Sequence, residues 1–239
     1  MNRARPVIAI DGPAGVGKST TARVIAQRLG YVLVDTGALY RGVALAAQDR
    51  GIAWDDEEAI AALSGEVQLT FESEADGTPR LAIGGVDRAD EIRTPEISAA
   101  ASQVSAYPSV RRALLGIQRS LGRDGGVVLE GRDIGTVVFP DAEVKLFLTA
   151  SAEERARRRS LDLQNRGMTA DRNQILSQIR SRDKADSTRP IAPLRPAEDA
   201  VILDSTSLDL EAVVEHVLEL VRSCDSSGSS GDSSDRTLG

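Results

Sequence analysis

The chain has 239 residues, 41% of them hydrophobic, enough for one sizeable domain with an insertion, and its net charge of −7 makes it a poor polyanion binder as a whole. No apolar run approaches the ~20 residues of a membrane span and no signal core follows the basic N-terminal residues, so we expect a cytoplasmic monomer with no membrane partner. The single cysteine, Cys224, excludes an intrachain disulfide and a zinc site built on cysteines.

The first strand and helix of the chain enclose a glycine-rich turn. Val7 to Ile10 is an apolar run suited to a buried strand, and apolar residues then recur at helical spacing up to Leu29. The turn between them, Gly12-x-x-x-x-Gly17-Lys18-Ser19, has the pattern of a phosphate-binding loop. A mobile surface loop is the alternative, which the flanking strand and helix disfavour.

This loop predicts a nucleotide site. Its glycines let backbone N–H groups converge on an anion, and the following helix adds positive charge at its N-terminus. Lys18 would reach the β- and γ-phosphates, and the Ser19 hydroxyl would ligate Mg²⁺, the predicted cofactor. The residues predicted to bind ATP are Gly12, Pro13, Ala14, Gly15, Val16, Gly17, Lys18, Ser19 and Thr20.

A second strand and helix follow directly. Tyr31 to Asp35 is apolar, and Thr36-Gly37 begins a helix that carries Tyr40 and Arg41. Strand and helix alternating at this spacing indicate right-handed βαβ units and a parallel sheet.

The pattern then changes to that of an inserted subdomain. Asp55-x-x-Glu58 is a capping signal for a short helix through Leu63. Glu66 to Gly85 alternates apolar and polar residues around a turn signal at Asp76-Gly77, which predicts a β-hairpin. We place the insertion at about residues 64–100.

Two helices lead back to the sheet. Thr94 is a predicted N-cap with Pro95 at the first helical position, and this helix should end before Pro108. The helix after it has one apolar face, formed by Val110, Leu114, Ile117 and Leu121.

Three further core strands are predicted at Gly125–Glu130, Val144–Thr149 and Val201–Asp204. The fold class is therefore α/β, a five-stranded parallel sheet flanked by helices, of the type of the nucleotide hydrolases that carry a phosphate-binding loop. A last helix with an apolar stripe from Leu210 to Val221 should pack on this sheet.

Positive charge is gathered in one segment. From Ser151 to Pro196 there are ten Arg and one Lys against six Asp and Glu, so this stretch carries +5 and the remainder −12. Ser151-x-x-Glu154 is a capping box that opens an arginine-rich helix, which we interpret as a lid over about residues 152–170.

From Ser223 to Gly239, Ser, Gly and Asp make up thirteen of seventeen residues, which predicts a disordered tail after a domain of residues 1–222.

Arginines on the lid favour a phosphate acceptor. A phosphate monoester is largely a dianion at neutral pH, so it needs no base, but it needs positive charge because two anions must be brought together. Arg155, Arg158 and Arg159 project from one helix face, where an anion would neutralise their repulsion. A solvated helix paired with its own acidic residues is the alternative.

Arg182 and Asp186 share a face of the next helix, where a simple surface ion pair is the alternative.

Five stretches together resemble bacterial cytidylate kinase, a family of nucleoside monophosphate kinases. The resemblance covers about Val7 to Val221, and the stretch E-G-R-D-I-G-T-V-V-F-P is the most specific part of it. The stretches are Ile10–Thr20, Asp35–Arg41, Ala101–Ser105 with Arg111, Glu130–Ala142 and Arg182–Arg189.

The resemblance implies ATP-dependent phosphorylation of CMP, and of dCMP, by direct in-line transfer. It implies that Ser102, Arg111 and Asp133 read the cytosine, since a carboxylate can accept from the amino group that uracil lacks. It places Arg182 and Asp186 on the ribose, and the acceptor phosphate among Thr36, Tyr40, Arg41, Arg132 and Arg189. The residues expected to act in catalysis are Lys18, Arg132, Arg155, Arg158 and Arg189.

Several alternatives stay open at this point. Glu130 either faces the Mg²⁺ shell or only orients Arg132. Another small-molecule kinase of the same fold, such as a UMP kinase, is the nearest alternative function. A nucleotide switch lacks the guanine-reading motif, since Asp183-Lys184-Ala185-Asp186 has the wrong first residue. A nucleic-acid binder would use the basic segment, but 3% aromatic residues leave little for base stacking.

Overall fold

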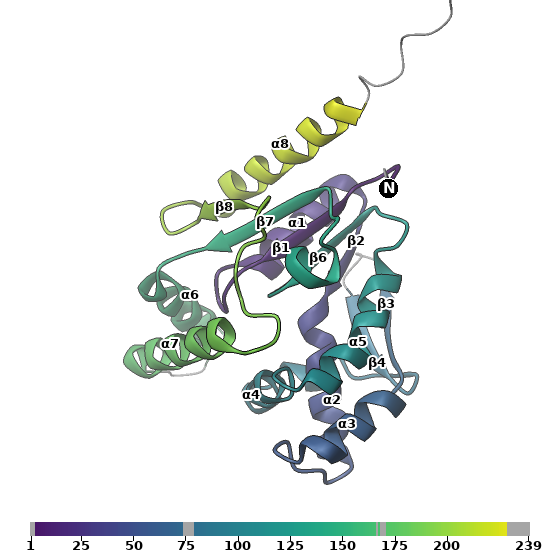
Figure 1. Cartoon of the computed structure of the whole chain (residues 1–239). Coiled ribbons are helices and arrows are strands. Elements are labelled where there is room, and N and C mark those ends of the chain that lie inside the picture. Colours follow the sequence, from purple (N-terminus) through teal and green to yellow (C-terminus); the bar gives the residue numbers. More distant parts are fainter. Residues whose placement is uncertain (1–2, 74–78, 166, 168–170, 229–239) are drawn as a thin grey trace, which may run out of the picture.

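The computed structural model describes residues 3–73, 79–165, 167 and 171–228, and its centre is a five-stranded sheet (Figure 1). The strand order is β2-β6-β1-β7-β8, and all neighbouring strands are parallel. All five strands predicted for the sheet are present. They are β1 (Val7–Asp11), β2 (Val32–Asp35), β6 (Val127–Gly131), β7 (Val144–Thr149) and β8 (Val201–Asp204).

Helices cover both faces of this sheet, which explains why its central strands are apolar throughout. Successive side chains of a strand point to opposite faces. Ile8 and Ile10 pack against helices α1 (Lys18–Leu29) and α8 (Leu210–Gly228), whereas Val7 and Ala9 pack on the opposite face. The fold is that of the phosphate-loop nucleotide-binding proteins, as predicted.

The loop between β1 and α1 depends on its glycines. Gly12, Gly15 and Gly17 have φ values of 152°, 74° and 103°, in the region that side chains disfavour. A Cβ atom on Gly12 would lie 2.1 Å from the carbonyl oxygen of Leu148 on the neighbouring strand β7. The first glycine of the motif therefore permits both the turn and the close approach of two backbones.

Replacing Gly12 by Ala should lower the free energy of unfolding by roughly 2–4 kcal/mol, because it adds a clash with rigid backbone to an unfavourable φ. The measurement is the urea midpoint and slope. Gly116→Ala in helix α5 (Pro108–Leu121) is the matched control: its Cβ would meet nothing within 4 Å. That change should stabilise by about 0.5–1 kcal/mol through helix propensity. Equal stability of the Gly12 variant and the wild type would contradict this reading of the loop.

The predicted insertion consists of helices around a small antiparallel sheet. The hairpin is confirmed, with Leu69 opposite Ile83, but a third strand that we did not predict follows it. The turn predicted at Asp76-Gly77 lies outside the described residues. From β2 to β6 the elements in chain order are α2 (Thr36–Asp49), α3 (Glu57–Glu66), β3 (Leu69–Ser73), β4 (Pro79–Ile83), β5 (Val86–Asp87), the 3₁₀-helix η1 (Glu91–Arg93), α4 (Pro95–Val104) and α5 (Pro108–Leu121). Helices α2 and α5 lie outside the bounds of about 64–100 predicted for the insertion.

Two predicted helix starts in this region had different outcomes. Thr94 caps α4 as expected, accepting a hydrogen bond from the N–H of Ile97 at 3.2 Å. The cap of α3 was predicted one residue early: Asp56, not Asp55, accepts from the N–H of Ala59, because only its position puts the carboxylate over the first turn.

The arginine-rich helix predicted as a lid and the helix after it form a separate small unit. Helices α6 (Ala152–Asn165) and α7 (Arg172–Thr188) pack through Ala156, Ile175 and Ile179. In Figure 1 this pair and the α2–α5 group lie as two lobes on the same side of the sheet. The last residues of the predicted lid, 168–170, lie outside the described residues.

The capping box at the start of α6 is only half formed. Ser151 Oγ accepts from the N–H of Glu154 at 3.2 Å, but the Glu154 carboxylate binds Arg157 and Arg158 instead of reaching back. The N–H of Ser151 donates to Thr206 Oγ1, so the β8–α8 connection completes the cap.

The C-terminal helix is longer than the sequence predicted. The apolar stripe of α8 packs on the sheet as expected, through Val213, Val214 and Val217. The tail was predicted to begin at Ser223, but α8 continues to Gly228, since an amphipathic helix anchored by its apolar face can extend into a polar stretch. The rest of the predicted tail, residues 229–239, lies outside the described residues. Among the described helices, none combines the length and apolarity needed to cross a bilayer.

Candidate active site

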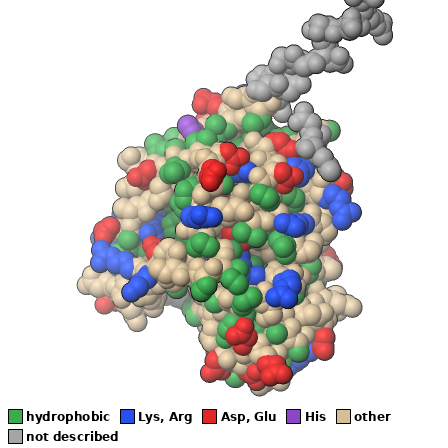
Figure 2. Space-filling view, in the orientation of Figure 1, with side chains coloured by type: hydrophobic (Ala, Val, Ile, Leu, Met, Phe, Trp, Pro, Cys, Tyr) green, Lys and Arg blue, Asp and Glu red, His purple; other side chains and the backbone are tan. Residues whose placement is uncertain are grey.

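A cavity of about 390 Å³ opens at the carboxyl ends of β2 and β6, beside the phosphate-binding loop. The outline of the molecule is hollowed between the α6–α7 pair and the lobe that contains α3 and α4 (Figure 2). Acidic side chains gather at the α3 end of that lobe, outside the hollow. All ten residues predicted to hold the acceptor line this one cavity. They are Thr36, Tyr40, Arg41, Ser102, Arg111, Arg132, Asp133, Arg182, Asp186 and Arg189.

Lys18 brings the donor loop to the same cavity. Its side chain is buried, and Nζ donates to the carbonyl of Pro13 at 2.8 Å. Burial, together with the charge of Arg132, lowers the pKa of Lys18, and Glu130 offsets part of this effect. Ala14, Gly15 and Ser19 also line the cavity. The loop and the predicted acceptor residues therefore face each other across one space.

The rest of the loop borders a second pocket. This pocket has a volume of about 560 Å³ and lies between the loop, helix α6 and the β8–α8 connection. Val16, Gly17 and Thr20 line it, whereas Gly12 and Pro13 line neither space. Of the nine residues predicted to bind ATP, seven therefore line one of the two pockets, and Gly12 and Pro13 line neither.

Ser19 and Glu130 form the part of the site that suits a metal ion. Ser19 Oγ donates to Glu130 Oε2 at 2.8 Å. Burial and the neighbouring Asp35 raise the pKa of Glu130. Arg132 bonds to Asp186 and to the carbonyl of Gly131 instead of to Glu130, which does not support Glu130 as its orienting partner.

This oxygen pair fits Mg²⁺ bound with a nucleotide. In the described part of the chain no three His, Cys, Asp or Glu side chains gather as a metal-binding group. Mg²⁺ in phosphoryl-transfer sites is usually held by one or two protein oxygens, with substrate phosphates and water supplying the others. A hydroxyl and a carboxylate beside the phosphate loop meet that requirement.

Three guanidinium nitrogens in the cavity lack a hydrogen-bond partner among the described residues. Arg41 Nε, Arg182 Nε and Arg189 Nη2 are buried and have no hydrogen-bond partner among the described residues, although Arg189 Nη2 lies 3.6 Å from Asp133. The cavity is lined by nine basic and four acidic residues. Burial and the charge of Arg132 lower the pKa of Arg182 to about 10. An unpaired buried donor costs free energy, so this excess charge is suited to an anionic ligand.

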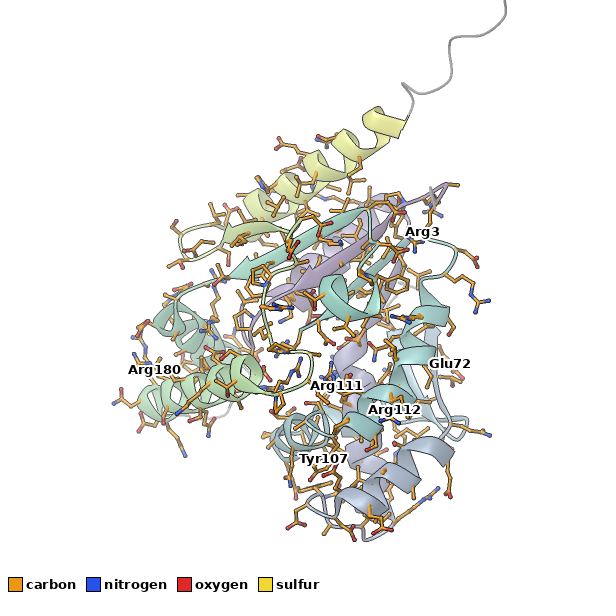
Figure 3. The ribbon with its side chains drawn as sticks, in the orientation of Figure 1. Arg3, Glu72, Tyr107, Arg111, Arg112 and Arg180 are labelled. Carbon is orange, nitrogen blue, oxygen red and sulfur yellow. The ribbon has the colours of Figure 1, made fainter. Side chains whose placement is uncertain are left out.

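The residues predicted to read the base form a buried cluster at the far end. Arg111 Nη2 pairs with Asp133, and Arg111 Nη1 donates to the carbonyl of Ser105 at 3.1 Å. The guanidinium carbon of Arg111 lies 5.4 Å from the centre of the Tyr40 ring. Figure 3 shows Arg111 between α5 and α7, whereas the neighbouring Arg112 lies elsewhere on α5. Carboxylate, guanidinium and ring together offer acceptor, donor and stacking surfaces.

Asp186 is not part of the surface ion pair that we considered. It is 6% exposed and accepts from Arg132 Nε at 3.0 Å, while Arg182 keeps a free Nε. The i, i+4 spacing on α7 could not reveal this, because the partner of Asp186 comes from the end of β6.

The three lid arginines were expected to face one anion together, and this expectation was wrong. Arg155 pairs with Asp183, Arg158 with Glu154, and Arg159 with Asp162. Arg155 is buried away from both openings, Arg158 lines the second pocket, and Arg159 lines the first cavity. Carboxylates, two of them on α6 itself, neutralise the like charges of these arginines, a role that the sequence analysis had given to a bound anion.

Two carboxylates that sequence reasoning missed support the site. Asp35 caps α2 and accepts from Arg41 Nη2 at 2.5 Å, and its position at the carboxyl end of a strand was the available signal. Asp11 accepts from the N–H groups of Ile134 and Gly135, both at 2.8 Å, and so joins the residue before the loop to the segment after Asp133. Burial raises the pKa of Asp11 to about 6.

Comparison with known proteins agrees with this arrangement. The sequence model of the cytidylate kinase family matches residues 8–223. The cytidylate kinase of Syntrophotalea carbinolica is 54% identical over 221 residues, which is 92% of this chain and 93% of that protein. The cytidylate kinase of Pseudomonas aeruginosa (strain UCBPP-PA14) is 50% identical over 230 residues, 95% of this chain and 99% of that protein.

A solved structure shares the fold at low sequence identity. The crystal structure of an uncharacterized protein from Eubacterium ventriosum superposes with a TM-score of 0.51 and 12% identity, covering 92% of this chain and 99% of that one. The family match over nearly the whole length, together with about half of all residues identical to the curated relatives, shows that this chain belongs to the cytidylate kinase family.

Proposed function

We propose that the protein transfers the γ-phosphoryl group of ATP to CMP, and to dCMP, releasing ADP and the nucleoside diphosphate. The observation that carries the proposal is the set of three buried guanidinium nitrogens without hydrogen-bond partners, on Arg41, Arg182 and Arg189, in the cavity that Lys18 also lines. The two anionic nucleotides must be brought together in this cavity, and phosphoryl transfer between them requires fixed positive charge next to both the donor and the acceptor phosphates.

ATP would enter from the second pocket. Its phosphates would lie on the backbone N–H groups of the loop, with the N-terminus of α1 behind them. Its adenosine would lie between the loop and the β8–α8 connection, beside Arg158, whose guanidinium is held by the carbonyls of Val16 and Ser205. This direction leaves the γ-phosphate at Lys18, pointing into the acceptor cavity.

The acceptor would bind opposite, with no need for a general base. Its phosphate is already largely a dianion at neutral pH, so Arg41, Arg132 and Arg189 would hold it for in-line attack. Arg182 and Asp186 would take the ribose. Asp133 would accept from the amino group of cytosine while Arg111 donates to the ring, with Ser102 beside them.

Mg²⁺ would be held by Ser19 and, through water or directly, by Glu130. When bound, it would neutralise charge on the donor phosphates. Helices α6 and α7 would serve as the lid that keeps water from the reacting groups. We expect the protein to act as a cytoplasmic monomer without nucleic-acid partners, and a single copy supplies every residue named here.

The test is an ADP-release assay with ATP and Mg²⁺ in which CMP, dCMP, UMP, AMP and GMP are compared as acceptors. We expect CMP and dCMP to give the highest kcat/KM, with UMP well below them. If UMP or a purine nucleotide is the best acceptor, the assignment of Asp133 and Arg111 to cytosine is wrong, although the fold and the donor site would stand.

A further inference from the structure

A half-buried ion pair joins helices α6 and α7 beside the phosphate loop. Arg155 Nη1 and Nη2 lie 2.9 and 2.6 Å from the two carboxylate oxygens of Asp183. Arg155 is only 4% exposed, and its remaining donors reach the carbonyls of Ala150 and Ala14, at 3.0 and 3.2 Å. Four of the five N–H donors of this guanidinium group are thus taken up by oxygens of the protein.

Both ends of this connection lead to a substrate. Ala14 belongs to the donor loop, and a Cβ atom on the next residue, Gly15, would lie 3.7 Å from Cβ of Arg155. Asp183 follows Arg182 in α7, the helix that also carries Asp186 and ends at Thr188, directly before Arg189. The path from the ATP loop to the acceptor residues therefore consists of one backbone carbonyl, one arginine and one carboxylate.

We propose that Asp183 is a positioning residue that couples the two substrate sites by holding Arg155 against the donor loop. The inference rests on the proposed function for the identity of the two ligands. Neither Arg155 nor Asp183 lines the acceptor cavity or the second pocket, so each acts through the other elements that it holds.

The physical basis is shared ordering of the lid. Helix α7 packs on α6 through a small apolar cluster of Ala156, Ile175 and Ile179, which gives the pair little anchoring of its own. ATP on the loop fixes the carbonyl of Ala14, and with it Arg155 and α7. CMP, which would contact residues of α7, then binds to a site that is already ordered, so ATP strengthens CMP binding. By thermodynamic linkage, CMP strengthens ATP binding by the same factor.

The same two helices offer a matched control. Arg180 of α7 pairs with Glu153 of α6 at 2.7 Å, but the two side chains are 63% and 56% exposed. Arg180 lies on the outer side of α7 (Figure 3). An exposed pair of this kind contributes little. Glu153→Gln therefore removes an α6–α7 ion pair without touching the donor loop.

The experiment is calorimetric titration of CMP into the full chain, with and without a non-hydrolysable ATP analogue and Mg²⁺. For the wild type and Glu153→Gln we expect the analogue to tighten CMP binding about fivefold or more. For Asp183→Asn we expect the ratio to fall to within about twofold of one, because the neutral amide no longer holds Arg155. A ratio in Asp183→Asn equal to that of the wild type overturns the proposal.

A second measurement keeps the test valid if Asp183→Asn does not fold. In the wild type, CMP alone should slow hydrogen exchange at the start of α6, around Arg155, and unchanged exchange there overturns the coupling. If CMP binds to the wild type but the ratio is one, only the coupling fails. If CMP does not bind at all, the proposed function fails, and the inference with it.

Discussion

Lys18→Met is expected to lower kcat by about 10³-fold or more, because in the proposed function it removes the ammonium group that would face the transferring phosphoryl group from the donor side. The variant should fold normally. Burial already lowers the pKa of Lys18, so its charge carries a desolvation cost in the free protein that methionine does not have. The measurements are single-turnover rates with ATP and CMP, and the thermal midpoint.

Lys145 supplies the matched control for this change. It is also a buried lysine, and its Nζ binds the carboxylate of Asp199 at 2.6 Å and the carbonyl of Pro140, away from both openings. Lys145→Met should lose about 1–3 kcal/mol of stability, because the carbonyl of Pro140 and the carboxylate of Asp199 both lose their donor, while kcat stays within about threefold of the wild type. If both variants lose activity equally, burial of a lysine and not its position at the donor phosphates governs the rate.

Asp133→Ala is expected to lower the preference for CMP over UMP by about 10²-fold or more, since a site built to bond a polar group discriminates strongly through it. The carboxylate is 5% exposed and pairs with Arg111, so water cannot easily replace it. The measurement is kcat/KM for both acceptors at saturating ATP. The KM for ATP should change by less than about threefold, because Asp133 lies away from the loop.

The comparison between acceptors separates recognition from structural support. Asp133 also lies 3.6 Å from Arg189, so a loss common to both acceptors is expected as the arginine cluster loosens. Only the additional loss for CMP reports contact with the base. Equal losses for CMP and UMP would show that Asp133 holds arginines in place and does not read cytosine.

The fold could be predicted from local patterns because the central strands of the sheet are buried on both faces and its strands are short apolar runs. Val144–Thr149 and Val201–Asp204 were predicted with the bounds that the structure has, since each is a short apolar run between polar turns. Strand β5 was missed because two residues are too few to show a period. Its pairing depends on Ala82 and Ile83 of the neighbouring strand, which propensity does not register.

The donor part of the candidate site could be predicted because all of its functional residues belong to one short sequence motif. The loop from Gly12 to Ser19 needs positive φ angles, an anion-binding helix start and one lysine, and each requirement falls on neighbouring residues. The acceptor residues came from the family resemblance, and all ten line one cavity. Their individual roles stay predictions until the variants are measured.

The sequence by itself determined the parallel sheet, the donor loop and the concentration of arginines beside it, because these depend on residue types at fixed, short spacings. Only the tertiary structure decided which arginines keep free donors for a ligand. Arg155 looked like a ligand-binding residue on the face of α6, but Asp183, 28 positions away, and the carbonyl of Ala14 take up its guanidinium. The availability of a charge depends on its burial and on its partners, and folding supplies those partners from distant parts of the chain.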